Sequence, residues 1–85
     1  MEIIFSPQSL DDLQFWKQSG NLKIQKRIQL LLESIIETPF EGIGKPEALK
    51  HNWTGYGSRR INQEHRIIYK MDNGKIIVAQ LRSHY

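Results

Sequence analysis

The chain of 85 residues contains no cysteine, which excludes disulfides and thiolate metal sites. No apolar run approaches the roughly 20 residues that a membrane-spanning helix needs, and the N-terminus has no signal-peptide pattern. We therefore expect a cytoplasmic protein without a membrane segment. The three histidines, His51, His65 and His84, have no metal-ligand spacing, so the sequence predicts neither a metal nor another cofactor.

Two glycine-containing motifs lack residues that catalysis would require. Residues 42–45 (Gly-Ile-Gly-Lys) resemble the end of a phosphate-binding loop. However, Pro39 stands where the first glycine belongs, and Pro46 stands where Ser or Thr must follow the lysine. Residues 55–58 (Gly-Tyr-Gly-Ser) do not match a nucleophile elbow. The sequence therefore does not indicate a P-loop nucleotide hydrolase or an α/β-hydrolase.

The composition is that of one ordinary globular domain, which we expect to span residues 1–85. Hydrophobic residues make up 39% of the chain and aromatic residues 9%. Charge is unevenly distributed, because residues 1–38 carry four Lys/Arg against five Asp/Glu, whereas residues 39–85 carry eight against four. A basic C-terminal half favours a polyanionic partner, with nucleic acid as the first candidate.

The N-terminal half predicts a short strand followed by two helices. Residues 2–5 are apolar enough for a buried strand, and Ser6-Pro7 is a helix start, with Ser6 as N-cap. Asp11 and Asp12 are expected to favour the dipole of this helix, which ends near Gly20. Asn21 caps a second helix, whose apolar stripe ends before residue 38. Its cationic residues, expected on the solvent side, are Lys23, Lys26 and Arg27.

Residues 39–57 predict a long loop, and the remainder predicts an antiparallel sheet. The loop is rich in glycine and holds two of the three prolines, with one short extended piece expected at residues 48–51. Strands are expected at about 58–62, at about 65–71 and from 75 onward. The fold class is therefore α+β, with two N-terminal helices packed on a mostly antiparallel, twisted sheet.

The Asp72-Asn73-Gly74 turn leaves two pairings open for the last hairpin. A two-residue turn pairs Asp72 with Lys75 and places Arg66 opposite Leu81. A three-residue loop with a bulge at the glycine instead pairs residue 71 with Lys75 and places Arg66 opposite residue 80. A joint role for Arg66 and His84 requires the second pairing, or a compensating bulge, because a shift of one residue turns side chains to the other face.

The basic half contains the residue types that metal-free RNA cleavage requires. Attack by the RNA's own 2′-hydroxyl needs a base, cations around the phosphate, and an acid for the departing 5′-oxygen. A carboxylate, several cations and a histidine supply these parts. The candidate residues are Glu47, Lys50, Arg59, Arg60, Arg66, His84 and Tyr85.

Four segments of the chain carry a resemblance to a known family. They are residues 38–52 (TPFEGIGKPEALKHN), residues 58–61 (SRRI), residues 64–66 (EHR) and the terminal His84-Tyr85. These segments, together with the chain length, resemble the YoeB/Txe group of toxins in the RelE-like (RelE/ParE) toxin–antitoxin superfamily. The resemblance implies a ribosome-dependent mRNA interferase, which cleaves mRNA in the ribosomal A site.

The same resemblance assigns roles to six residues. It implies that Glu47 is the general base, His84 the general acid, and Arg66 the residue that stabilises the phosphate in the transition state. Tyr85 would orient or stack on a base, and Lys50 and Arg60 would make supporting phosphate contacts. Arg59, on the opposite face of its strand from Arg60, is expected to be structural or to make a minor contact.

The resemblance also implies partners, and it leaves rival functions to be tested. Ribosome and mRNA would be the targets, and a cognate antitoxin would cover the site with a disordered acidic segment. Whether the toxin forms a homodimer stays open. The alternatives are a gyrase-targeting toxin of the same superfamily and a non-catalytic basic RNA-binding module.

Overall fold

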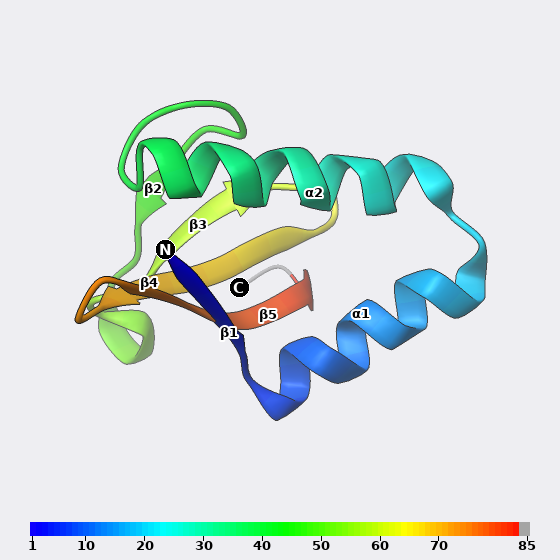
Figure 1. The fold of residues 1–85 in the computed structure, drawn as a ribbon, viewed down its shortest axis with the longest axis horizontal. Helices are drawn as coiled ribbons and strands as arrows, with labels where there is room; N and C mark the ends of the chain where they lie inside the picture. The colour runs from blue at the N-terminus through cyan, green and yellow to red at the C-terminus, as the bar shows by residue number, and fades with distance from the viewer. Residues whose placement is uncertain (84–85) are drawn as a thin grey trace.

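Five strands form one sheet, and two helices pack against one of its faces in the computed structural model, which describes residues 1–83 (Figure 1). The strand order is β1-β5-β4-β3-β2; β1 runs parallel to β5, and the other neighbours are antiparallel. The expected α+β architecture is therefore confirmed. The elements are β1 (Glu2–Phe5), α1 (Pro7–Ser19), α2 (Leu22–Glu37), β2 (Glu47–Ala48), the 3₁₀ turn η1 (His51–Trp53), β3 (Gly57–Arg60), β4 (Arg66–Asp72) and β5 (Lys75–Ser83).

Both helices begin where the sequence predicts. The Ser6 side chain accepts a hydrogen bond from the Ser9 N–H at the start of α1, and the Asn21 side chain accepts one from the Ile24 N–H at the start of α2. The apolar stripe of α2 and Trp16 of α1 then pack onto the sheet. The buried core residues from the sheet are Ile67 and Tyr69 of β4, and Ile76, Val78 and Leu81 of β5.

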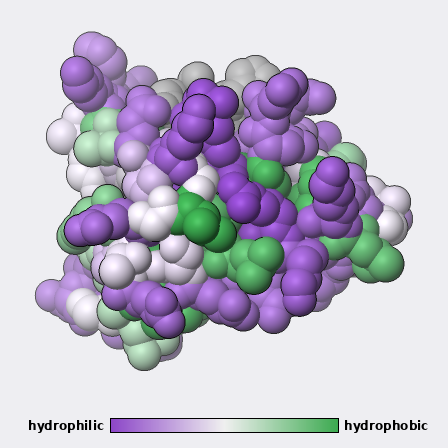
Figure 2. Space-filling view, turned by 90° about the horizontal axis from the view of Figure 1, so that it is seen from above, coloured by the Kyte–Doolittle hydropathy of each residue, from purple (hydrophilic) through white to green (hydrophobic). Residues whose placement is uncertain are grey.

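The outer side of α2 is mainly hydrophilic. Figure 2 looks down on this side and shows hydrophobic side chains scattered among hydrophilic ones. Leu30 and Ile36 are partly exposed on α2, and Phe40, just beyond the helix, is 79% exposed. No helix within residues 1–83 combines the length and the apolar character needed to cross a membrane.

The last hairpin closes with a two-residue turn, so the three-residue alternative is wrong at this point. Asp72 pairs with Lys75, while Asn73 and Gly74 both have positive φ (50° and 76°), as a type I′ turn requires. The pairing then shifts twice, between Tyr69 and Ile68 and between Ile68 and Arg66. Arg66 therefore lies opposite Ser83, two positions beyond the residue that an unbroken register would give it.

Side chains of α1 replace a missing strand along the second half of β5. The parallel pairing with β1 ends at Val78, which leaves one edge of residues 79–83 without a strand partner. The Ser6 hydroxyl donates to the Ala79 carbonyl (2.7 Å), and the Trp16 indole N–H donates to the Leu81 carbonyl (2.9 Å). Asp12 accepts a hydrogen bond from the Leu81 N–H (2.9 Å). These bonds satisfy the backbone where β5 departs from regular pairing.

The expected dipole role of Asp11 and Asp12 is wrong. The first turn of α1 contains no acidic residue, and the effect of the dipole fades beyond that turn. Asp12 is instead buried (4% exposed), and its two oxygens accept hydrogen bonds from the Gln8 side chain and the Leu81 N–H. Asp12 therefore stabilises β5, because it accepts the hydrogen bond of a backbone N–H in that strand.

Replacement of Asp12 by alanine is expected to lower the free energy of unfolding by about 2 kcal/mol, because it leaves the buried Leu81 N–H without an acceptor. Urea unfolding monitored by circular dichroism measures the loss. The matched control is Asp11→Ala, which removes an exposed neighbour and should change stability by less than about 0.5 kcal/mol. Equal losses in the two variants would contradict this role for Asp12.

Candidate functional site

The face of the sheet away from the helices, here called the distal face, carries the candidate site. Ile67 and Tyr69 of β4 point into the core with the helices, so the alternating residues Arg66, Ile68 and Lys70 point to the distal face. The register extends this face across the neighbouring strands. Arg60 lies opposite Arg66, while Ser58 lies opposite both Ile68 and Glu47.

Glu47 and Arg66 meet on the distal face, although 19 positions separate them in the sequence. The Arg66 Nη1 lies 3.5 Å from the Glu47 Oε2. The arginine side chain is 20% exposed and the carboxylate 57% exposed, so the carboxylate faces solvent from beside a largely covered cation. An accessible base next to a fixed guanidinium is the pairing that 2′-hydroxyl attack on a phosphate requires.

Arg59 fixes the loop that leads to Glu47. It is fully buried, and within residues 1–83 no carboxylate forms an ion pair with it. Its guanidinium donates to the carbonyls of Thr38 (2.5 Å), Glu41 (2.7 Å) and Ile43 (3.3 Å). It also donates to the hydroxyls of Ser34 (2.6 Å) and Tyr69 (3.3 Å). The prediction that Arg59 is structural is therefore confirmed.

Two glycines let this loop close around the guanidinium. Gly42 and Gly44 have φ of 117° and 85°, a region that residues with side chains rarely adopt. A Cβ at Gly42 would lie 2.4 Å from the Ser34 hydroxyl, and one at Gly44 would lie 2.7 Å from a Leu31 methyl. Residues 42–45, which resemble part of a phosphate-binding loop, therefore belong to a loop that encloses the Arg59 guanidinium. The extended piece that follows is Glu47–Ala48, which begins one residue and ends three residues earlier than the expected piece at 48–51.

Arg60 lies between the distal face and a second basic surface. Its side chain is exposed, and in the strand pairing it lies opposite Arg66. Its backbone carbonyl accepts a hydrogen bond from the Arg27 side chain (3.3 Å). Arg60 also lines a groove of about 730 Å³ at the start of α2. Lys23, Lys26 and Arg27 supply further cations to that groove, so the three helix residues expected on the solvent side adjoin the site.

Of the three remaining predicted site residues, the structure describes one, Lys50. Lys50 is exposed at the N-cap of η1, three residues after Glu47. His84 and Tyr85 lie outside the described residues, so the predicted meeting of His84 with Arg66 stays a prediction. Within residues 1–83, no group of three His, Asp or Glu side chains is arranged to hold a metal ion.

Lys70 and Tyr56 are distal-face residues that the sequence reasoning missed. The Lys70 ammonium lies over the Tyr56 ring, 5.2 Å from its centroid, and Trp53 packs edge-on against the same ring. The signal was present in the alternation of β4, because a lysine two residues beyond Ile68 must share the face of Arg66.

Comparison with known proteins identifies the family to which the chain belongs. The family model described as a YoeB-like toxin of bacterial type II toxin-antitoxin systems matches residues 5–85. The chain belongs to the YoeB toxin family. Toxin YoeB of Escherichia coli K12 is 44% identical over 85 residues, which cover 100% of both chains.

Two solved structures from Staphylococcus aureus show the YoeB fold in different assemblies. One is a heterotetrameric YoeB–YefM toxin–antitoxin complex, whose matching chain is 48% identical to this YoeB-family member with a TM-score of 0.90. The other is a YoeB dimer, also 48% identical, with a TM-score of 0.91. Each match covers 100% of this chain and 98% of the other.

Replacement of Arg59 by methionine is expected to cost about 3 kcal/mol or more of unfolding free energy, because the loop carbonyls lose the buried guanidinium that donates to them. Urea unfolding measures this loss. Arg60→Met is the matched control, since the neighbouring side chain is exposed, and its effect on stability should stay within about 0.5 kcal/mol. Similar unfolding midpoints for the two variants would show that the loop does not depend on the guanidinium.

Proposed function

We propose that this chain is a ribosome-dependent endoribonuclease that cleaves mRNA in the ribosomal A site and thereby inhibits translation in the cytoplasm. The observation that carries the proposal is the Glu47–Arg66 pair, 3.5 Å apart on a basic sheet face, in a member of the YoeB toxin family. The pair supports acid–base cleavage through the 2′-hydroxyl, because it sets a solvent-accessible carboxylate beside a cation for the phosphate.

The proposed reaction uses only groups of the chain and of the RNA. Glu47 takes the proton of the 2′-hydroxyl, and the 2′-oxygen forms a bond to the adjacent phosphorus. The bond from phosphorus to the 5′-oxygen breaks, and His84 gives that oxygen a proton. The products are a 2′,3′-cyclic phosphate and a free 5′-hydroxyl. Arg66 stabilises the added phosphate charge, Lys50 and Arg60 hold the phosphate, and Tyr85 orients a base.

We further propose that an antitoxin with an acidic, disordered segment covers this face in the resting complex. The support is the S. aureus relative, seen in complex with YefM, together with the net charge of +3 on this chain. The dimer of the S. aureus relative similarly supports a homodimer as one state of the free toxin.

Replacement of Glu47 or His84 by alanine is expected to slow cleavage by about 10²- to 10⁴-fold each, because each removes a proton-transfer group. Arg66→Ala should cost about 10²-fold through lost charge stabilisation. Single-turnover cleavage on mRNA-programmed ribosomes, with mapping of the new ends, measures all three. Full activity of the Glu47→Ala variant would refute its assignment as the base.

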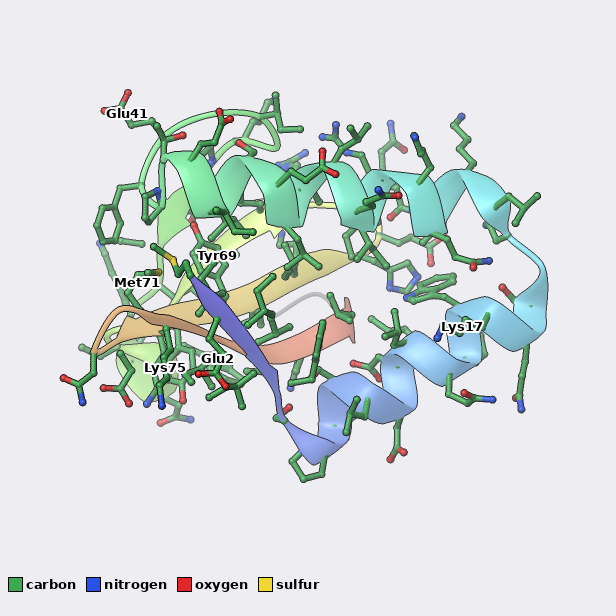
Figure 3. The ribbon with its side chains drawn as sticks, viewed as in Figure 1. Glu2, Lys17, Glu41, Tyr69, Met71 and Lys75 are labelled. Carbon is green, nitrogen blue, oxygen red and sulfur yellow. The ribbon has the colours of Figure 1, made fainter. Side chains whose placement is uncertain are left out.

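Glu41→Ala is the matched control, since it removes a carboxylate from the same loop without touching the site. Figure 3 shows the Glu41 side chain directed away from the body of the molecule. The rival functions give different outcomes. A gyrase-targeting toxin produces no new mRNA ends. A non-catalytic RNA-binding module predicts that His84→Ala weakens RNA binding in step with activity, whereas catalysis predicts lost turnover with binding retained.

A further inference from the structure

A pocket of about 240 Å³ adjoins the Glu47–Arg66 pair at the β2 edge of the sheet. Glu47 lines the pocket and also belongs to the candidate site, so the two share this residue. The other walls include the exposed Phe40, the Tyr56–Lys70 pair, and, from the helix side of β4, the buried Tyr69 and the partly buried Met71. Figure 3 shows Tyr69 and Met71 together near the loop that carries Glu41.

The pocket combines aromatic surface with a cation. Phe40 is 79% exposed although it is large and apolar, and the Tyr56 ring is half-buried. Within residues 1–83, no carboxylate forms an ion pair with Lys70. Aromatic walls that accept a flat ring, beside an ammonium that accepts a phosphate, suit a nucleotide of single-stranded RNA. An apolar peptide side chain would fill the pocket without using the cation.

The sheet register gives the direction in which an RNA strand would cross the site. Arg60 and Arg66 occupy one row of the distal face, Glu47 lies in the next row, and the Tyr56–Lys70 pair lies one row further. Successive rows are about 7 Å apart, because same-face residues in a strand are two positions apart. A path from the two arginines past Glu47 therefore leads to the Tyr56–Lys70 pair, which lines the pocket.

The proposed chemistry orients that path. The attacking 2′-oxygen belongs to the nucleotide on the 5′ side of the cleaved bond, and Glu47 must lie beside this oxygen. Continuing from Glu47, away from the arginines, therefore leads toward the 5′ end of the RNA. We propose that the Phe40–Tyr56–Lys70 pocket binds a nucleobase on the 5′ side of the cleaved bond, with Lys70 contacting the backbone phosphate beside it.

This inference rests on the proposed function, and one experiment tests the two separately. Programmed ribosomes carry either normal mRNA or mRNA with an abasic ribose at one of the two nucleotides 5′ of the mapped cut. Single-turnover cleavage rates are measured for the wild type and for Tyr56→Leu, Phe40→Ala and Lys70→Ala. Phe40→Ala serves if Tyr56→Leu fails to fold, because Phe40 is largely exposed. Lys17→Ala is the charge-matched control, and Lys17 lies on α1, far from Tyr69 and Met71 (Figure 3).

The wild type and Lys17→Ala should cleave abasic mRNA about tenfold more slowly than normal mRNA at one of the two positions. Tyr56→Leu and Phe40→Ala should be about tenfold slower on normal mRNA and should lose nothing further on abasic mRNA. Lys70→Ala should be slower on both, because its phosphate contact does not depend on the base.

Four results would overturn the pocket assignment. If the wild type cuts both mRNAs equally, or if Tyr56→Leu and Phe40→Ala lose equal factors on both, the pocket does not bind a base, although the proposed function stands. If the variants cleave normally and instead bind an acidic antitoxin peptide more weakly, the pocket belongs to the antitoxin. If the wild type cuts neither mRNA, the proposed function fails and this inference fails with it.

Discussion

The wrapping of residues 38–44 around the Arg59 guanidinium determines where the candidate base stands. Arg59 rises from β3, and its donors reach α2 and the loop beyond it, so one side chain joins three parts of the chain. The Arg60 N–H adds a hydrogen bond to the Gly44 carbonyl (2.7 Å). With the loop held at both points, the chain enters β2 at Glu47, whose register with Ser58 then directs the carboxylate to the distal face. The structural Arg59 and the candidate site residue Arg60 are adjacent in the sequence because successive residues of a strand point to opposite faces.

The other side of the site is positioned independently, by α1. β5 gains two residues relative to β4 between Tyr69 and Arg66, and such bulges need partners for the displaced backbone groups. Ser6, Asp12 and Trp16 supply them. The N-cap of a helix therefore also stabilises the strand that brings Ser83 opposite Arg66. Two systems of polar contacts therefore hold the strands beside the Glu47–Arg66 pair, one centred on Arg59 and the other on α1.

Local patterns predicted most of the fold, and longer-range polar contacts account for what they missed. The helix caps, the apolar stripe of α2 and a hairpin at residues 72–74 follow from residues close in sequence, and the structure confirms each. Which of the two turns closes that hairpin did not follow from the sequence. The bulges of β5 and the burial of Asp12 depend on contacts between residues about 70 positions apart, which periodicity does not report. The Glu47–Arg66 pair was expected from the family resemblance, since spacing alone did not place the two residues together. The alternation of residues along β4 was sufficient to predict that Lys70 shares the face of Arg66, but this prediction was not made.

The absence of an ion-pair partner for Arg59 within residues 1–83 has an electrostatic consequence for the opposite side of the sheet. Its acceptors are carbonyl and hydroxyl oxygens, which contribute partial charges and leave most of the positive charge uncompensated. Mobile ions in solution screen a buried charge less than an exposed one. Part of the positive potential above β3 therefore originates inside the molecule, where added salt weakens it less than it weakens the attraction of surface lysines.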